Sequence, residues 1–118
     1  MSVSNSRVRI LLLQARYPDD PAGGEEARSF AERTAVAMEQ MVPWDLLQGP
    51  PTLAQVCRHD ALMVGGSGDF YVSKRDLPQH QRTLDLLLDV VERGHPTFAS
   101  CFGFQCLVQA LGGEIVYD

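Results

Sequence analysis

The sequence lacks three features that would each have assigned it to a broad class. It has no long hydrophobic run: the aliphatic stretch at residues 8–14 is interrupted by an arginine and is far shorter than the roughly 18 residues of a membrane span. It has no excess of positive charge, because 10 Lys and Arg face 15 Asp and Glu, for a net charge of −5. Phosphate backbones and anionic lipids repel such a chain, so we expect it to bind neither nucleic acid nor a membrane. The short apolar run also lacks a signal-peptide cleavage site, which predicts a cytoplasmic protein.

The sequence is also poor in cysteine, with only three residues of this type, at positions 57, 101 and 106. They are odd in number and form no Cys-x-x-Cys pair, a pattern that argues against a disulfide framework and favours a reducing compartment. Cys57 and Cys106 lie in apolar surroundings and are predicted to be structural. We expect neither a metal nor a cofactor.

What the sequence does contain is a regular alternation of secondary-structure signals. Its 45% hydrophobic and 21% charged residues are typical of one globular domain, covering residues 1–118. Aliphatic segments of strand length alternate with amphipathic segments of helical period. Strands are predicted at residues 8–14, 44–47, 61–64, 97–100 and 114–117. Helices are predicted at residues 25–41, 53–58, 79–93 and 101–111.

This alternation predicts an α/β fold. Strands without polar alternation are normally buried on both faces, as in parallel sheets. We therefore expect an open, mostly parallel sheet with helices on both faces, joined by right-handed crossovers. Ligands of such folds bind beyond the carboxyl ends of the strands. Two turns, at residues 65–68 and 99–103, follow predicted strands and should lie at this edge.

The second of these turns has the pattern of a nucleophile elbow around Cys101. Ala99 and Gly103 flank the cysteine at a strand-to-helix turn, and small flanks are needed where a nucleophile is held at strained dihedral angles. The helix N-terminus stabilises a thiolate, and the Phe102 N–H points to where an oxyanion would form. The pattern predicts a nucleophilic Cys101; the alternative is a buried structural cysteine.

The first turn, Gly-Gly-Ser-Gly at residues 65–68, offers backbone N–H groups that no side chain obstructs. It can supply a second oxyanion donor, for which we favour Gly66. A phosphate-binding turn is a weaker interpretation, because a complete Gly-x-Gly-x-x-Gly is absent. The acidic pair Asp19 and Asp20, which follows the first strand, is predicted to lie in a solvated loop.

Together these segments resemble the class I glutamine amidotransferases. That family has a Gly-x-Cys-x-Gly-x-Gln elbow, which residues 99–105 match, and a Leu-Gly-Gly helix end, which residues 111–113 match. Its Gly-Gly-Pro-like oxyanion loop corresponds to residues 65–67. Ala99 replaces the usual glycine of the elbow and Ser67 the usual proline of the loop, and both are small. The resemblance implies a flavodoxin-like sheet that is incomplete at its C-terminus.

The resemblance also implies roles for individual residues. Cys101 would attack the side-chain carboxamide of L-glutamine, and the N–H groups of Gly66 and Phe102 would bind the oxyanion. Gly103 and Gln105 would face the bound glutamine. Ammonia would leave, and hydrolysis of the glutamyl thioester would release glutamate. In this family the ammonia usually passes to a synthase domain or subunit, which is therefore an expected partner.

One part of the family pattern is missing from this sequence. The family completes its catalytic triad with a later His-x-Glu motif, and the sequence ends at Asp118 before such a motif. His59, His80 and His95 are not predicted to reach Cys101. We therefore expect these 118 residues alone to lack full activity.

Two alternatives to a glutaminase stay open. One is a related cysteine hydrolase that cleaves a γ-glutamyl or peptide bond. The other is a non-catalytic split domain that pairs with another chain, or with a second copy of itself, through an exposed sheet edge.

Overall fold

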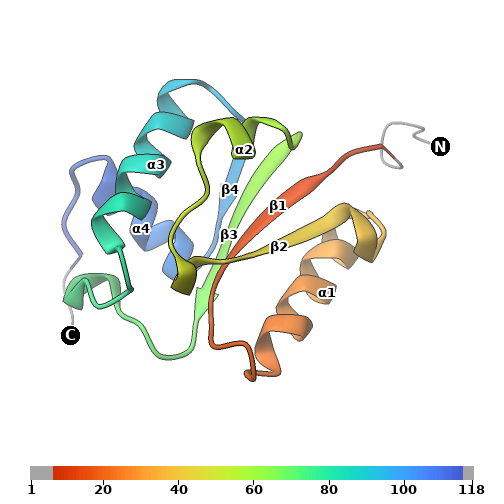
Figure 1. Ribbon diagram of the computed structural model, residues 1–118, viewed down its shortest axis with the longest axis horizontal. Helices are drawn as coiled ribbons and strands as arrows, with labels where there is room; N and C mark the ends of the chain where they lie inside the picture. The colour runs from red at the N-terminus through yellow and green to blue at the C-terminus, as the bar shows by residue number, and fades with distance from the viewer. Residues whose placement is uncertain (1–6, 116–118) are drawn as a thin grey trace.

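The computed structural model describes residues 7–115 and contains one four-stranded parallel sheet with helices on both faces (Figure 1). The strands are β1 (Ile10–Ala15), β2 (Met41–Asp45), β3 (Ala61–Ser67) and β4 (Thr97–Ala99), in the spatial order β2-β1-β3-β4. The helices are α1 (Ala22–Thr34), α2 (Leu53–Cys57), α3 (His80–Glu92) and α4 (Phe102–Ala110). Three 3-10 turns occur at Met38–Gln40, Leu46–Gln48 and Val72–Lys74. The predicted open parallel α/β sheet, of flavodoxin-like type, is confirmed.

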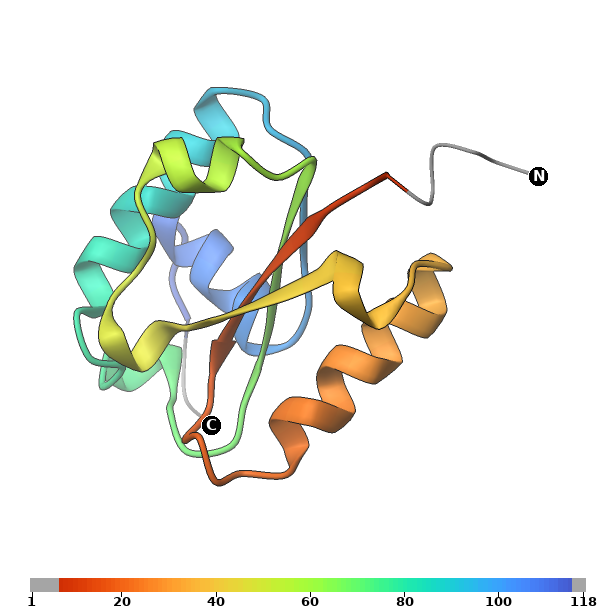
Figure 2. The same cartoon turned by 45° about the vertical axis from the view of Figure 1, so that its right-hand side comes forward.

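The two faces of the sheet are covered unequally. Helix α1 lies alone on one face, whereas α2, α3 and α4 lie on the other (Figure 2). Alternate residues of β1 point to opposite faces of the sheet. Leu11 and Leu13 pack in the larger apolar cluster, with α3 and α4. Ile10 and Leu12 pack in the smaller cluster, beneath α1. Because β1 is central and buried on both faces, it explains the continuous aliphatic run in the sequence.

The register of the sheet contains one irregularity, close to its carboxyl edge. Leu13 pairs with Val64, but Ala15 pairs with Ser67, so β3 has one more residue than β1 over this interval. The predicted end of this strand at residue 64 is therefore wrong, because β3 continues through both glycines of the turn to Ser67. A bulge of this kind bends the strand locally and is common beside functional sites.

Helix α1 ends earlier than the periodicity predicted. The apolar pattern suggested a helix to residue 41, but the helix ends at Thr34, and Ala35 adopts the left-handed conformation at φ 58°. The Val36 N–H then donates to the Ala31 carbonyl at 3.0 Å, which closes the helix end in the manner of a Schellman motif. Apolar residues continue at helical spacing to Met41, but residues 38–40 form a 3-10 turn and Met41 begins β2.

Two further boundaries differ from expectation. The second strand is Met41–Asp45 rather than residues 44–47. It contains Pro43, which has no N–H to donate; β2 tolerates it because an edge strand has a neighbour on one side only. Of the strand expected at 114–117, Glu114 and Ile115 have no regular structure, and residues 116 and 117 lie outside the described residues.

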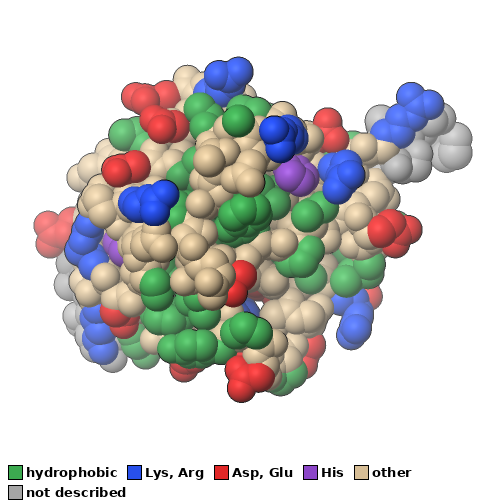
Figure 3. All heavy atoms as spheres, in the orientation of Figure 1, with side chains coloured by type: hydrophobic (Ala, Val, Ile, Leu, Met, Phe, Trp, Pro, Cys, Tyr) green, Lys and Arg blue, Asp and Glu red, His purple; other side chains and the backbone are tan. Residues whose placement is uncertain are grey.

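The surface shows no concentration of one charge on the face seen in Figure 3, where acidic and basic side chains are interspersed. Within residues 7–115, none of the helices combines the length and the apolar character needed to cross a bilayer.

Candidate functional site

A cavity of about 530 Å³ lies at the carboxyl edge of the sheet and contains the expected nucleophile. The ends of β1, β3 and β4 bring Arg16, Gly66 and Cys101 to its wall, and α1 contributes Glu26. The strand order changes direction between β1 and β3, because β2 lies on one side of β1 and β3 on the other. Such a switch point is where open α/β sheets bind their ligands.

Cys101 is held in an unusual backbone conformation. Its φ of 51° and ψ of −118° lie outside the regions that residues with a side chain ordinarily adopt. Hydrogen bonds fix the turn on both sides: the Ser100 N–H donates to the Val64 carbonyl at 3.2 Å, and the Gln105 N–H donates to the Cys101 carbonyl at 3.1 Å. Cys101 is exposed and occupies the N-cap position of α4, where its side chain makes no capping hydrogen bond. This is the geometry expected of a nucleophile elbow.

Gly103 explains how the elbow is kept tight. It is buried, and a Cβ atom at this position would overlap the carbonyl oxygen of Val64 in β3. Only glycine therefore allows the first turn of α4 to pack so closely on the strand. The resemblance placed Gly103 at bound glutamine, whereas the structure places it against β3 and outside the cavity wall.

The other residues expected at the site lie around Cys101. Phe102 and Gln105, from the first turn of α4, line the cavity together with Gly66. A Cβ atom on Gly66 would lie 3.9 Å from the Cβ of Cys101, so the two residues are immediate neighbours. The structure thus brings the predicted nucleophile and both predicted oxyanion donors to one cavity.

The Gly66 N–H is engaged by a side chain that the sequence did not assign to the site. It donates to Glu26 Oε2 at 2.7 Å, across 40 positions of sequence. Gln14 Nε2 donates to the other carboxylate oxygen at 3.2 Å. The Glu26 carboxylate oxygen therefore accepts the hydrogen bond that Gly66 was predicted to offer to an oxyanion.

Arg16 is a second residue missed by the sequence reasoning. Its Nη2 contacts Glu26 Oε2 at 3.4 Å and its Nη1 contacts Asp20 Oδ2 at 3.7 Å. Asp20 also accepts a bond from the Ala22 N–H at 2.9 Å, so it caps the start of α1. The prediction of a purely solvated acidic loop is therefore wrong for Asp20, although Asp19 is exposed.

The remaining cysteines and histidines lie elsewhere. Cys106 is fully buried, and desolvation raises the pKa of its thiol from 9.0 to about 12, as expected of a structural residue. His59 and His95 precede β3 and β4, at the opposite edge of the sheet. His80 Nε2 pairs with Gln109 Oε1 at 2.7 Å between α3 and α4. None of the three histidines lines the cavity.

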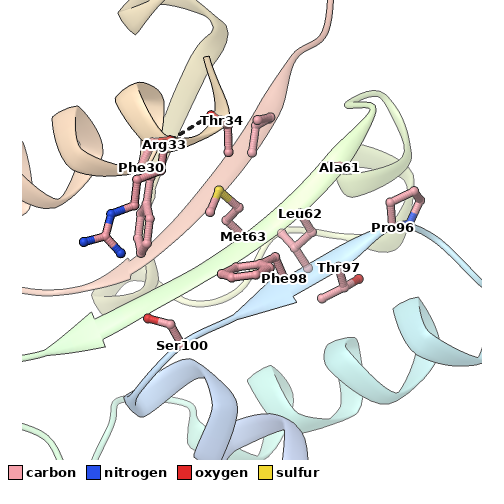
Figure 4. Close-up of a pocket in the computed structure, with 11 residues that line it drawn as sticks. Phe30, Arg33, Thr34, Ala61, Leu62, Met63, Pro96, Thr97, Phe98 and Ser100 are labelled. Carbon is pink, nitrogen blue, oxygen red and sulfur yellow. Dashed lines mark hydrogen bonds between the residues drawn. The ribbon is translucent and has the colours of Figure 1, made fainter. Parts of the chain in front are cut away.

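A separate apolar hollow of about 450 Å³ lies on the α1 face of the sheet (Figure 4). Phe30 of α1, Met63 of β3 and Phe98 of β4 form much of its wall, with Arg33 at the side. Phe98 is 60% exposed. The hollow exists because α1 covers only part of this face.

Within the described range, no three His, Cys, Asp or Glu side chains converge in a way that could hold a metal ion. No protein-family model matches the sequence, and no curated protein matches it either.

Proposed function

We propose that this chain carries the nucleophile of a glutaminase of the class I glutamine amidotransferase type. The observation that supports this most is the strained Cys101 at φ 51° in a cavity at the carboxyl edge of the sheet. A non-glycine residue persists in such a conformation only where its surroundings enforce it, and such residues cluster at functional sites. The strained turn holds the thiol at the N-terminus of α4, beside the backbone N–H groups of its first turn.

The reaction proceeds in two steps. Cys101 Sγ attacks the carboxamide carbon of L-glutamine, and the Phe102 N–H at the start of α4 binds the developing oxyanion. The Gly66 N–H contributes the second bond once Glu26 releases it. Collapse of the tetrahedral intermediate breaks the C–N bond, and the nitrogen leaves with an added proton as ammonia. Water then hydrolyses the glutamyl thioester to glutamate and the free thiol.

Complete turnover needs a general acid and a general base, roles that a histidine usually fills. No histidine of the described residues lines the cavity. We therefore assign the nucleophilic thiol and the oxyanion donors to this chain, and expect both proton transfers, the one that lets ammonia leave and the one that activates water, to depend on groups outside residues 7–115. A synthase domain or subunit would receive the ammonia.

Covalent labelling tests the proposal. The diazoketone analogue of glutamine, 6-diazo-5-oxo-L-norleucine, should add one adduct to the 118-residue chain, and peptide mass spectrometry should place it on Cys101. Cys101→Ser should abolish the adduct, whereas the control Cys57→Ser should retain it. Failure of the analogue to label a Cys101 that iodoacetamide still alkylates would contradict the proposal.

Self-association is a second candidate role, favoured by the edge strand β4 and its exposed Phe98. A second copy could cover the apolar hollow of Figure 4 and pair along β4. Sedimentation velocity over a range of protein concentrations should then show a dimer, which Phe98→Asp would dissociate. A monomer at all concentrations would exclude this role.

A further inference from the structure

Arg16 has a position that its local contacts do not explain. It is the one cationic side chain among the described residues that line the Cys101 cavity, and Glu26 is the one anionic side chain there. A Cβ atom on Gly66 would lie 3.1 Å from Arg16 Nη2, so the guanidinium reaches over the predicted oxyanion donor. Only 16% of its side chain is exposed. A cation withdrawn from water to this extent requires close anionic partners.

The partners that Arg16 has are distant. Charge-assisted N–H···O bonds are usually about 2.8 Å long, whereas its contacts to Glu26 and Asp20 measure 3.4 and 3.7 Å. The Nε atom is buried and has no hydrogen-bond partner in the described part of the chain. Since a guanidinium offers five N–H groups in a planar fork, Arg16 retains the capacity to bind a carboxylate closely.

Glu26 is held by other groups than Arg16. Its two oxygens accept from the Gly66 N–H at 2.7 Å and from Gln14 Nε2 at 3.2 Å, both shorter than its contact to Arg16. Arg16 and Glu26 are therefore neighbours of opposite charge rather than a tight ion pair. Each can exchange its present contacts for those of a ligand.

We propose that Arg16 and Glu26 form the subsite that binds the α-amino acid group of the substrate beside Cys101. Arg16 binds the α-carboxylate through its fork, and Glu26 binds the α-ammonium group. The inference rests on the proposed function, since glutamine carries both groups two methylenes away from its carboxamide. A cavity wall with one charge of each sign favours a zwitterion. Glu26 repels an acid that has no ammonium group, and Arg16 repels an amine that has no carboxylate.

The subsite also explains how the Gly66 N–H becomes available. When the substrate ammonium draws the Glu26 carboxylate toward itself, the bond of 2.7 Å between Gly66 and Glu26 is broken. The donor is then free for the oxygen of the scissile carboxamide. Recognition of an amino acid and completion of the oxyanion site are thus one event.

The test compares two reagents for the same thiol in the 118-residue chain. One is 6-diazo-5-oxo-L-norleucine, which has the amino acid group, and the other is iodoacetamide, which lacks it. The ratio of their second-order rate constants at Cys101 measures recognition, and general effects of a substitution on folding or thiol reactivity cancel in it. Arg16→Met should lower the ratio ~10- to 100-fold, the value of a hydrogen-bonded charge, and Arg16→Lys should restore part of it. Glu26→Gln should also lower the ratio.

A control variant and a control reagent complete the design. Arg28→Met, at an exposed arginine of α1, should leave the ratio unchanged. The N-acetylated diazoketone lacks the ammonium group and should react slowly with the wild-type chain, with no further loss in Glu26→Gln.

The outcomes separate the two proposals. An unchanged ratio in Arg16→Met, with the diazoketone still labelling Cys101, would overturn the subsite and leave the proposed function standing. Absence of diazoketone labelling in the wild-type chain, with iodoacetamide still reactive, would overturn the proposed function and the subsite with it.

Discussion

Cys101 and Cys106 are five positions apart, one just before α4 and one within it, yet the structure gives them opposite environments. Cys101 precedes the first turn of α4, is exposed and has a positive φ of 51°. Cys106 lies within the helix, is fully buried in the larger apolar cluster and has a pKa raised to about 12 by desolvation. Position relative to the helix N-terminus and to the core therefore decides what a thiol can do.

The sharpest test of this difference is alkylation. With a pKa of about 12, roughly one Cys106 thiol in 10⁵ is ionised at pH 7, and burial blocks access to it as well. We expect iodoacetamide to modify Cys101 at least ~1000-fold faster than Cys106 in the native protein. Peptide mass spectrometry after timed quenching measures both rates, and in urea the two should converge. Similar rates in the native protein would remove the distinction between the cysteines.

The next largest effect is the pH dependence of stability that Cys106 causes. The ordinary pKa of the thiol is 9.0 and burial raises it to about 12 in the folded protein, so above pH 9 the unfolded chain loses the proton first. This contribution to stability is complete below pH 9 and is lost as the pH rises to about 12, by ~4 kcal/mol in total.

Urea denaturation between pH 8 and 11 measures this loss. Cys106→Ala should be less stable at pH 8 but should show a shallower decline with pH than the wild type. Cys101→Ala should keep the wild-type slope, and an equal slope in all three proteins would exclude Cys106 as the cause.

Gly103 lies between the two cysteines and holds the helix to the sheet, so its substitution should disturb both environments. Gly103→Ala places a methyl group on the Val64 carbonyl and should lower the free energy of unfolding by ~2–3 kcal/mol. Gly24→Ala is the control, because a Cβ atom there meets nothing within 4 Å and α1 should gain stability. Equal effects of the two substitutions in urea denaturation would show that α4 does not depend on the close contact.

The smallest expected effect separates the strain of Cys101 from its chemistry. Cys101→Gly and Cys101→Ala both remove the thiol, but only glycine tolerates φ 51° without strain. Cys101→Gly should therefore be more stable than Cys101→Ala by ~1 kcal/mol in thermal or urea denaturation. The reverse order would indicate that the elbow relaxes when the cysteine is absent.

Much of this arrangement could be predicted because its causes are local. The sheet follows from buried aliphatic runs that alternate with helices, and the elbow follows from small residues on either side of Cys101. The end of α1 was missed because apolar residues continue at helical spacing after Thr34, while the backbone reverses at Ala35. Hydrophobic periodicity contains no signal for that reversal.

The charged part of the site was missed for a different reason. Glu26 accepts a hydrogen bond from the Gly66 N–H although the two residues are 40 positions apart in the sequence. Arg16 reaches the cavity only because β1 lies beside β3. Such contacts depend on sheet order and register, which a single sequence does not specify. The sequence signal available was an acidic residue in the first half of a helix, which is equally well explained by the helix dipole.

The positive φ at position 101 affects how this protein can change over generations. Most random substitutions destabilise a protein, whereas glycine at position 101 would relieve strain, because it is the residue that this backbone accommodates most easily. Under selection for folding alone, position 101 would drift toward glycine and the protein would gain stability. A cysteine is retained there only while its function outweighs the gain in stability. A lineage that no longer needs this function should therefore lose the thiol early. It should keep Gly103, because a larger residue would overlap the Val64 carbonyl.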